Sequence, residues 1–234
     1  MGRVLTLHKI LEFPETLETT IVGQERVQIE GDTADAETRI YAADENDVPD
    51  FNKFIIRHNQ KYSIEGKVWN RQFKEILRTI QISVYKRDSK DTQFILPIGN
   101  SKGSYAIASF KRLRKSTAVK CDEVKIDLIE AVETIIKSDA GIEISSGWFS
   151  NIGLPNLNNA LLQGAEANLG AAWNEYKQRD GATLSNVELA IEDDDFENGY
   201  VKLSLSKRGI IFSKKNIPDK KLLELAERII ELLF

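Results

Sequence analysis

Alternating hydrophobic and polar positions predict mostly β structure in the first half of the chain. The early apolar run of Val4, Leu5 and Leu7 around Thr6 indicates a short strand with both faces partly covered. Residues 79–113 contain three such runs separated by turn-forming residues, which predicts an antiparallel meander. The strands expected in this half are residues 3–10, 19–29, 38–42, 62–68, 79–87, 92–98 and 104–113.

Helical spacing of apolar residues occurs once in the first half and repeatedly in the second. Apolar residues from Trp69 to Ile80 predict a helix at residues 70–77, directly after the strand that ends near Val68. Pro218 occupies the position of a first-turn proline and predicts the start of a final helix. The other helices expected in the second half are residues 126–137 and 154–178. The strands expected there are residues 142–144, 187–191, 200–206 and 210–214.

These elements predict an α+β fold, in which a mostly antiparallel N-terminal β region with a basic β-meander precedes a helix–helix–β–β–β–helix half. The helices are grouped and do not alternate with strands, which argues against a doubly wound α/β sheet. The 234 residues are expected to form a β-rich region at 1–120 and an α+β region at 121–234. One continuous domain is the alternative, because a chain of this length allows either arrangement.

Charge is distributed unevenly, although the formal net charge of the whole chain is only −4. Residues 1–52 carry a net of −8, residues 53–120 a net of +12 and residues 121–234 a net of −8. A basic segment between acidic flanks favours a polyanionic partner such as nucleic acid. The alternative is that this segment packs against the acidic flanks within the fold, because separation along the chain does not establish separation in space.

The basic segment, residues 53–120, interleaves its cations with aromatic residues. Phosphates attract cations and unstacked bases stack on aromatic rings, so this mixture favours a nucleic-acid-binding surface. The alternative is that the aromatics are core and the cations are their solvated opposite face. The candidate nucleic-acid-binding residues are Lys67, Arg71, Lys74, Arg78, Lys86, Arg87, Lys90, Lys102, Lys111, Arg112, Arg114 and Lys115. The first four recur at helical spacing and are expected on one side of the helix at 70–77.

A second candidate is catalytic and consists of Asp50, Glu65 and Lys67. Pro49-Asp50, followed after fourteen residues by Glu65-Gly66-Lys67, matches the PD…(D/E)xK pattern of metal-dependent nucleases. Two carboxylates would hold Mg²⁺, which activates water, while the lysine orients the nucleophile. This site requires a strand at 62–68 and a carboxylate of Asp50 within a few ångströms of Glu65. The pattern is short, and E-x-K triplets also occur at 123–125 and 175–177.

The remaining residues exclude some chemistry. With Cys121, His8 and His58 as the chain's single cysteine and two histidines, no intramolecular disulfide and no zinc site is expected, and Cys121 is expected to be an inert thiol. The acidic cluster at 192–197 is interpreted as a polar loop between two strands. Small residues around Gly164 in the helix at 154–178 indicate a close helix contact, either within the chain or between subunits.

The function expected from the sequence is nucleic-acid binding through residues 53–120, either alone or as a subunit of a nucleic-acid-handling complex. One alternative is the Mg²⁺-dependent nuclease, and a cofactor is expected only in that case. Another is a non-enzymatic assembly or scaffold protein that meets an acidic protein partner. A homo-oligomer is left open. The N-terminus lacks the features of a signal peptide and no apolar run approaches about 20 residues, so a cytoplasmic location without a membrane partner is expected.

Overall fold

The structure is a computed structural model that describes residues 2–14, 18–26, 33–87, 93–99, 103–115 and 118–234. The chain forms two compact units, an N-terminal unit of His8–Glu123 and a C-terminal unit of Met1–Leu7 with Val124–Phe234. Antiparallel strands predominate in both, and the described residues contain four α-helices, so the expected mixed α+β class is confirmed.

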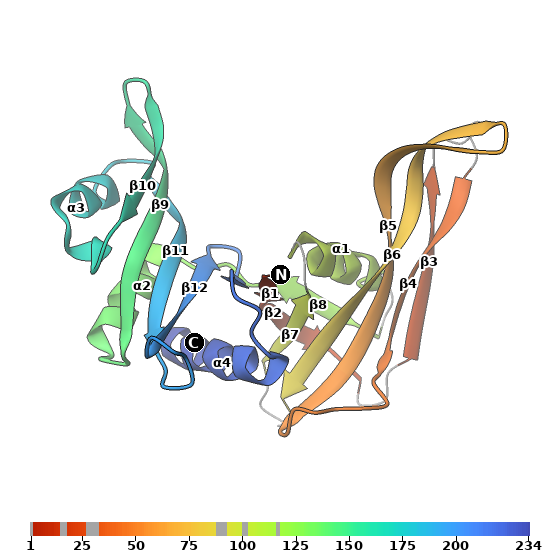
Figure 1. The fold of residues 1–234 in the computed structure, drawn as a ribbon, viewed down its shortest axis with the longest axis horizontal. Helices are drawn as coiled ribbons and strands as arrows, with labels where there is room; N and C mark the ends of the chain where they lie inside the picture. Colours follow the sequence, from red (N-terminus) through yellow and green to blue (C-terminus); the bar gives the residue numbers. More distant parts are fainter. Residues whose placement is uncertain (1, 15–17, 27–32, 88–92, 100–102, 116–117) are drawn as a thin grey trace. The chain divides into compact units, whose positions relative to one another are not determined.

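The N-terminal unit is an antiparallel sheet with one helix packed against it (Figure 1). Within the described residues its strand order is β8-β2-β7-β6-β5-β4-β3, and every pairing is antiparallel. The elements are β2 (His8–Glu12), β3 (Glu18–Arg26), β4 (Thr33–Ala42), β5 (Phe51–Val68), β6 (Arg71–Arg87), β7 (Phe94–Gly99), α1 (Ser104–Leu113) and β8 (Lys120–Glu123).

The core of this unit lies between α1 and one face of the sheet. Phe54 and Ile56 of β5 alternate inward together with their cross-strand partners Val84 and Ile82 of β6. Helix α1 adds Ala106, Phe110 and Leu113, whose spacing of four and three residues forms one apolar face. Burial of these side chains fixes the root of β5 and β6, the two longest strands of the unit.

Two expectations in this unit are wrong. The helix expected at 70–77 is absent, because β6 begins at Arg71 and pairs with β5 along its whole length. Residues 104–113 are helix α1 and not the third strand of a meander, since their buried positions follow helical and not alternating spacing. The first two strands of the expected meander do pair, as β6 with β7.

In the C-terminal unit, helices accompany antiparallel strands in the order β10-β9-β11-β12-β13-β1. Helix α2 packs against α4, β9 and β11 (Figure 1). Both helices bury an apolar face. The elements are β1 (Arg3–Thr6), α2 (Leu128–Lys137), β9 (Ile142–Leu154), β10 (Leu157–Gln163), the 3₁₀ turn η1 (Ala167–Leu169), α3 (Ala171–Lys177), β11 (Thr183–Glu192), β12 (Tyr200–Ser206), β13 (Ile210–Ser213) and α4 (Asp219–Leu233).

Most elements expected in the second half are present, with one large error. The helices at 126–137 and after Pro218 are confirmed as α2 and α4, and the last three strands as β11, β12 and β13. The long helix expected at 154–178 is wrong: its first part is strand β10, paired with β9, and α3 covers only its last part. Gly164 therefore follows a strand, and a subunit contact through a small-residue helix face at this position is ruled out.

Candidate functional site

The most distinctive feature of the N-terminal unit is the outer part of the β5–β6 hairpin, residues 59–80, which we call the β arm. In the described part of the chain, β4 pairs with β5 only as far as His58, and β7 pairs with β6 no farther out than Ser83. Beyond these points β5 and β6 pair with each other alone, and Figure 1 shows the hairpin curving away at its outer end. Among the described residues, the β arm is thus a two-stranded ribbon without a further paired strand.

Polar side chains anchor the root of the β arm. Arg112 of α1 donates hydrogen bonds to the carbonyl oxygen of Asn59 at 3.2 Å and to the hydroxyl of Thr38 at 3.3 Å. The same hydroxyl lies 2.7 Å from Nδ1 of the buried His58. The Asn59 side chain accepts a bond from the Glu37 amide at 2.8 Å. These bonds join α1, β4 and β5 at the place where the arm leaves the sheet.

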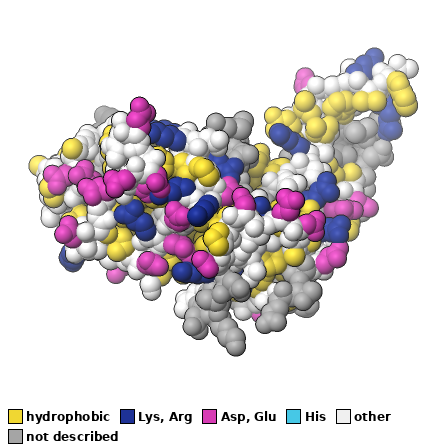
Figure 2. Space-filling model, turned by 60° about the horizontal axis from the view of Figure 1, so that its bottom comes forward, with side chains coloured by type: hydrophobic (Ala, Val, Ile, Leu, Met, Phe, Trp, Pro, Cys, Tyr) yellow, Lys and Arg dark blue, Asp and Glu magenta, His cyan; other side chains and the backbone are white. Residues whose placement is uncertain are grey.

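One face of the β arm carries three of the predicted cations. Lys67 lies opposite Gln72, and alternation along β6 places Lys74 and Arg78 on the same face as Gln72. Tyr62 shares this face, and the Arg78 guanidinium lies 5.9 Å from the centre of its ring. In the space-filling view, hydrophobic and basic side chains gather at the far right, where the hairpin ends (Figure 2). Three basic side chains and one aromatic ring, the residue types that suit phosphates and unstacked bases, therefore lie together on one face of the β arm.

The opposite face of the β arm is stabilised locally. A Cβ atom on Gly66 would lie 2.3 Å from Cζ of Phe73, its cross-strand partner, so the phenyl ring lies directly on the glycine. Lys61 and Glu75 form an ion pair across the strands at 3.3 Å. Arg71 lies on this face and not with the other three cations, because the region is a strand and not the expected helix.

The tip of the β arm exposes large apolar side chains. Trp69 and Asn70 form a two-residue loop between the paired Val68 and Arg71. The Trp69 side chain is 92% exposed and that of Val68 is 56% exposed. The sequence places Trp69 among the aromatics of the basic segment, but its position in an exposed hairpin loop was not predicted. The alternation of residues 62–68 indicated a strand that ends just before Trp69. The helical spacing of apolar residues from Trp69 to Ile80 then led to the prediction of a helix in place of the second strand of a hairpin.

The other predicted cations lie apart from the β arm or have structural partners. Arg112 is bonded to backbone at the arm's root, and Arg114 pairs with Asp122 at 2.5 Å. Lys111 and Lys115 are exposed near the end of α1. Lys86 and Arg87 lie at the other end of β6, while Lys90 and Lys102 fall outside the described residues.

The three residues of the nuclease alternative are not brought together. Asp50 immediately precedes β5, whereas Glu65 and Lys67 lie near its far end, Glu65 within a β-bulge. Each residue of a strand advances about 3.3 Å, so fifteen residues separate these carboxylates far beyond the distance that a shared ion spans. Within the described residues, no group of three His, Cys, Asp or Glu could hold a metal ion.

Two other candidates from the sequence have structural roles. Cys121 is buried, and burial raises the pKa of its thiol to about 12, as expected for an inert cysteine. In the acidic cluster, Asp193 lies 2.8 Å from Lys221 of α4, which also pairs with Asp195. Although burial opposes it, this pairing raises the pKa of Lys221 above its usual range. The cluster is a polar loop that holds α4.

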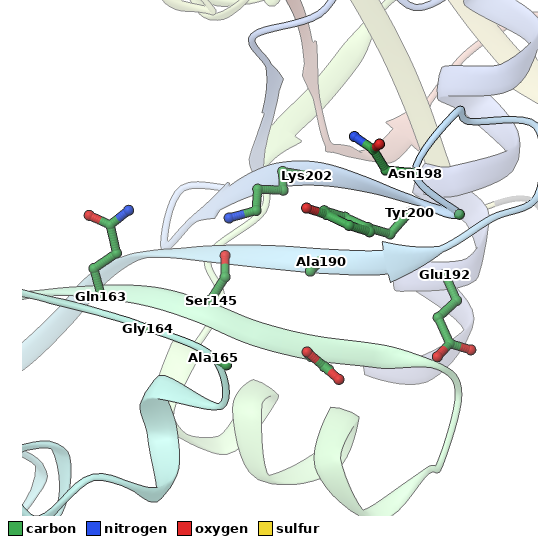
Figure 3. A pocket seen from close by; sticks show the side chains of 11 residues that line it. Ser145, Gln163, Gly164, Ala165, Ala190, Glu192, Asn198, Tyr200 and Lys202 are labelled. Carbon is green, nitrogen blue, oxygen red and sulfur yellow. The ribbon is translucent and has the colours of Figure 1, made fainter.

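The C-terminal unit has a shallow hollow of about 500 Å³ on its sheet, lined by residues that include Ser145 of β9, Gln163 of β10, and Tyr200 and Lys202 of β12 (Figure 3). Beside it, Glu188 accepts a hydrogen bond from Ser145 at 2.8 Å and pairs with Lys202 at 3.2 Å. Burial acts to raise the pKa of the Glu188 carboxyl, but these two partners outweigh it and hold that pKa below its usual range. Glu188 therefore stays ionised as part of a structural ion cluster, with no proton to donate near neutral pH.

Comparison with known proteins adds no family to this picture: no protein-family model matches the chain, and no curated protein matches its sequence. In the described part of the chain, no helix is long and apolar enough to cross a membrane.

Proposed function

We propose that this protein binds nucleic acid through the β arm. The observation that carries the proposal is the shared face of Lys67, Lys74 and Arg78 on a two-stranded ribbon that extends beyond its neighbours in the sheet. A two-stranded β ribbon is narrow enough to enter a DNA groove, and cations on it are placed to neutralise phosphates. Residues 59–80 carry five Lys or Arg against two Glu, a net of +3.

Among the described residues, the ion pair within the β arm lies on the face opposite Lys67, Lys74 and Arg78. The Lys61–Glu75 pair engages one cation and one acid of the β arm on the opposite face. Elsewhere in the basic segment Arg112 and Arg114 are bonded within the unit, so they contribute less than the sequence suggested. The binding surface is therefore smaller than residues 53–120 and is centred on the outer hairpin.

The test is a binding titration with duplex DNA, single-stranded DNA and RNA at several salt concentrations. The variant K67A/K74A/R78A should bind every sequence more weakly. If all three cations contact phosphate, its plot of log K against log salt should flatten by up to about 2.7, at about 0.9 per lost contact to duplex. Circular dichroism should show that the variant is folded.

The matched control is K137A/K207A/K220A, which removes the same charge from exposed positions of the C-terminal unit. This control should bind with nearly the wild-type salt dependence. Equal binding by the wild type and by the folded arm variant would overturn the proposal. If the wild type binds an acidic protein but shows no salt-dependent binding of nucleic acid, the scaffold alternative is favoured.

A further inference from the structure

Trp69 is placed where neither folding nor solubility favours a tryptophan. Its side chain is 92% exposed, so nearly all of its large apolar surface faces water. The neighbouring Val68 is also exposed, at 56%. The chain's third tryptophan, Trp173, is buried against Phe149 with ring centres 5.0 Å apart, as the physics of an indole favours. Exposed apolar surface of this kind at a projecting tip marks a place of contact.

The backbone at Trp69 is equally unfavourable for this residue type. Its φ is +51°, in the left-handed region that glycine adopts without steric cost. Trp69 is the first residue of a two-residue hairpin loop, and a positive φ at that position is characteristic of glycine in a type II′ turn. A tryptophan here costs both backbone strain and solvent exposure. Strain retained at one position is a sign that the side chain serves a function.

We propose that Trp69 inserts between stacked base pairs of duplex DNA and bends it, an inference that rests on the proposed function of the β arm. Proteins that bind the minor groove insert apolar wedges between base steps, which unstacks them and kinks the duplex. Lys67 lies two residues from Trp69, and Lys74 follows on the same face, so phosphates on either side of the opened step come within reach of cations.

Duplex is favoured over single strands by the geometry of the tip. Proteins that bind single strands lay successive bases on several aromatic rings across a face. The β arm instead carries one indole at the turn of a two-stranded ribbon. The Tyr62 ring lies well back from the tip, about seven residues along β5, where it contacts Arg78. A single terminal wedge with flanking cations matches an opened base step.

The experiment compares W69G and W69F with the wild type on a short duplex carrying a fluorophore at each end. Glycine suits a positive φ, so W69G should fold at least as well as the wild type while it lacks the wedge. Loss of base–aromatic stacking should weaken duplex binding roughly 5- to 150-fold, with an unchanged salt slope because no charge is removed. The bend-dependent energy transfer should disappear in W69G and be partly retained in W69F.

Trp148→Ala is the matched control, because Trp148 is a partly exposed tryptophan on β9 of the C-terminal unit. It should bind and bend the duplex as the wild type does. If W69G also bends DNA normally, the wedge is overturned while the binding function stands. The wedge is also overturned if W69G loses affinity only for single strands. The same holds if W69G changes the oligomer mass in light scattering without changing the bending of the duplex. If the wild type binds no nucleic acid, both proposals fail together.

Discussion

The guanidinium of Arg112 donates a hydrogen bond to the carbonyl oxygen of Asn59 at 3.2 Å and thereby ties helix α1 to the root of the β arm. Besides its bond to Thr38, the same nitrogen also donates to the carbonyl oxygen of Ala36 on β4, at 3.2 Å. The Arg112 side chain thus bonds to both β4 and β5 at the point where their pairing ends. The sequence predicted Arg112 as a phosphate contact, whereas the structure gives it a role in positioning the arm.

Replacing Arg112 by Ala should therefore loosen the β arm. Partly buried carbonyls that lose a charged donor destabilise a fold by about 1–3 kcal/mol. We expect faster amide hydrogen exchange across residues 59–80 in R112A and a lower free energy of unfolding by denaturant. R112K keeps the charge but not the fork of donors, so it should fall between the two. Unchanged exchange in the arm would show that Arg112 does not anchor it.

The contact between Gly66 and Phe73 predicts a sharp steric effect inside the arm. In G66V the new Cβ would overlap the phenyl ring, which must then leave the surface of β5. We expect the outer hairpin to exchange its amides faster, with a cost on the order of 1–3 kcal/mol to local stability. In G66V/F73A the clash is absent, so the double variant should be less perturbed than the sum of the two single ones. Strictly additive effects would contradict the contact.

The buried His8 predicts that stability falls in mild acid. Burial lowers the pKa of His8 from 6.5 to about 4, although the nearby Glu123 acts in the opposite direction. Between these values the unfolded chain binds a proton that the folded state excludes, so the free energy of unfolding decreases as pH falls from about 6.5 towards 4. The full decrease is about 3 kcal/mol, and below pH 4 this contribution is constant.

Denaturant titrations at pH 7, 5.5 and 4 would measure this dependence. His8→Gln removes the titrating group, so the difference in stability between the wild type and H8Q should shrink as the pH falls across this window. Carboxylates that do not interact with His8 titrate equally in both proteins and cancel in that difference. A constant difference at all three pH values would show that His8 is protonated equally in the folded and unfolded states.

The elements recovered from sequence are those whose apolar faces repeat over several turns or alternate cleanly. Helix α2 repeats Leu128, Val132 and Ile135 on its buried face, and α4 begins just after Pro218. Strand β12 alternates Val201, Leu203 and Leu205 inward. In such segments the local period alone specifies the element, because the same face meets the core at every repeat.

The segments that were misread are those where two periods fit the same residues. Lys74 and Arg78 are four residues apart, a spacing that places them on one side of a helix and on one face of a strand alike. The sequence therefore identified their shared side correctly while it assigned the wrong element. Similarly, Leu157 and Leu161 suggested a helical stripe, yet they lie on the edge strand β10, where both are exposed.

What the sequence determined by itself was the α+β composition, the helices and strands of clear period, and the concentration of positive charge in residues 53–120. What only the tertiary structure decided was that residues 59–80 form a ribbon with Trp69 at its tip, and that Arg112 holds its root. Pairing of Phe51 with Arg87 joins residues far apart in the chain, and Arg112 reaches Asn59 across a similar span. No local pattern encodes such partners, because the hydrogen bonds of a β ribbon form between segments and their geometry exists only once the chain has folded.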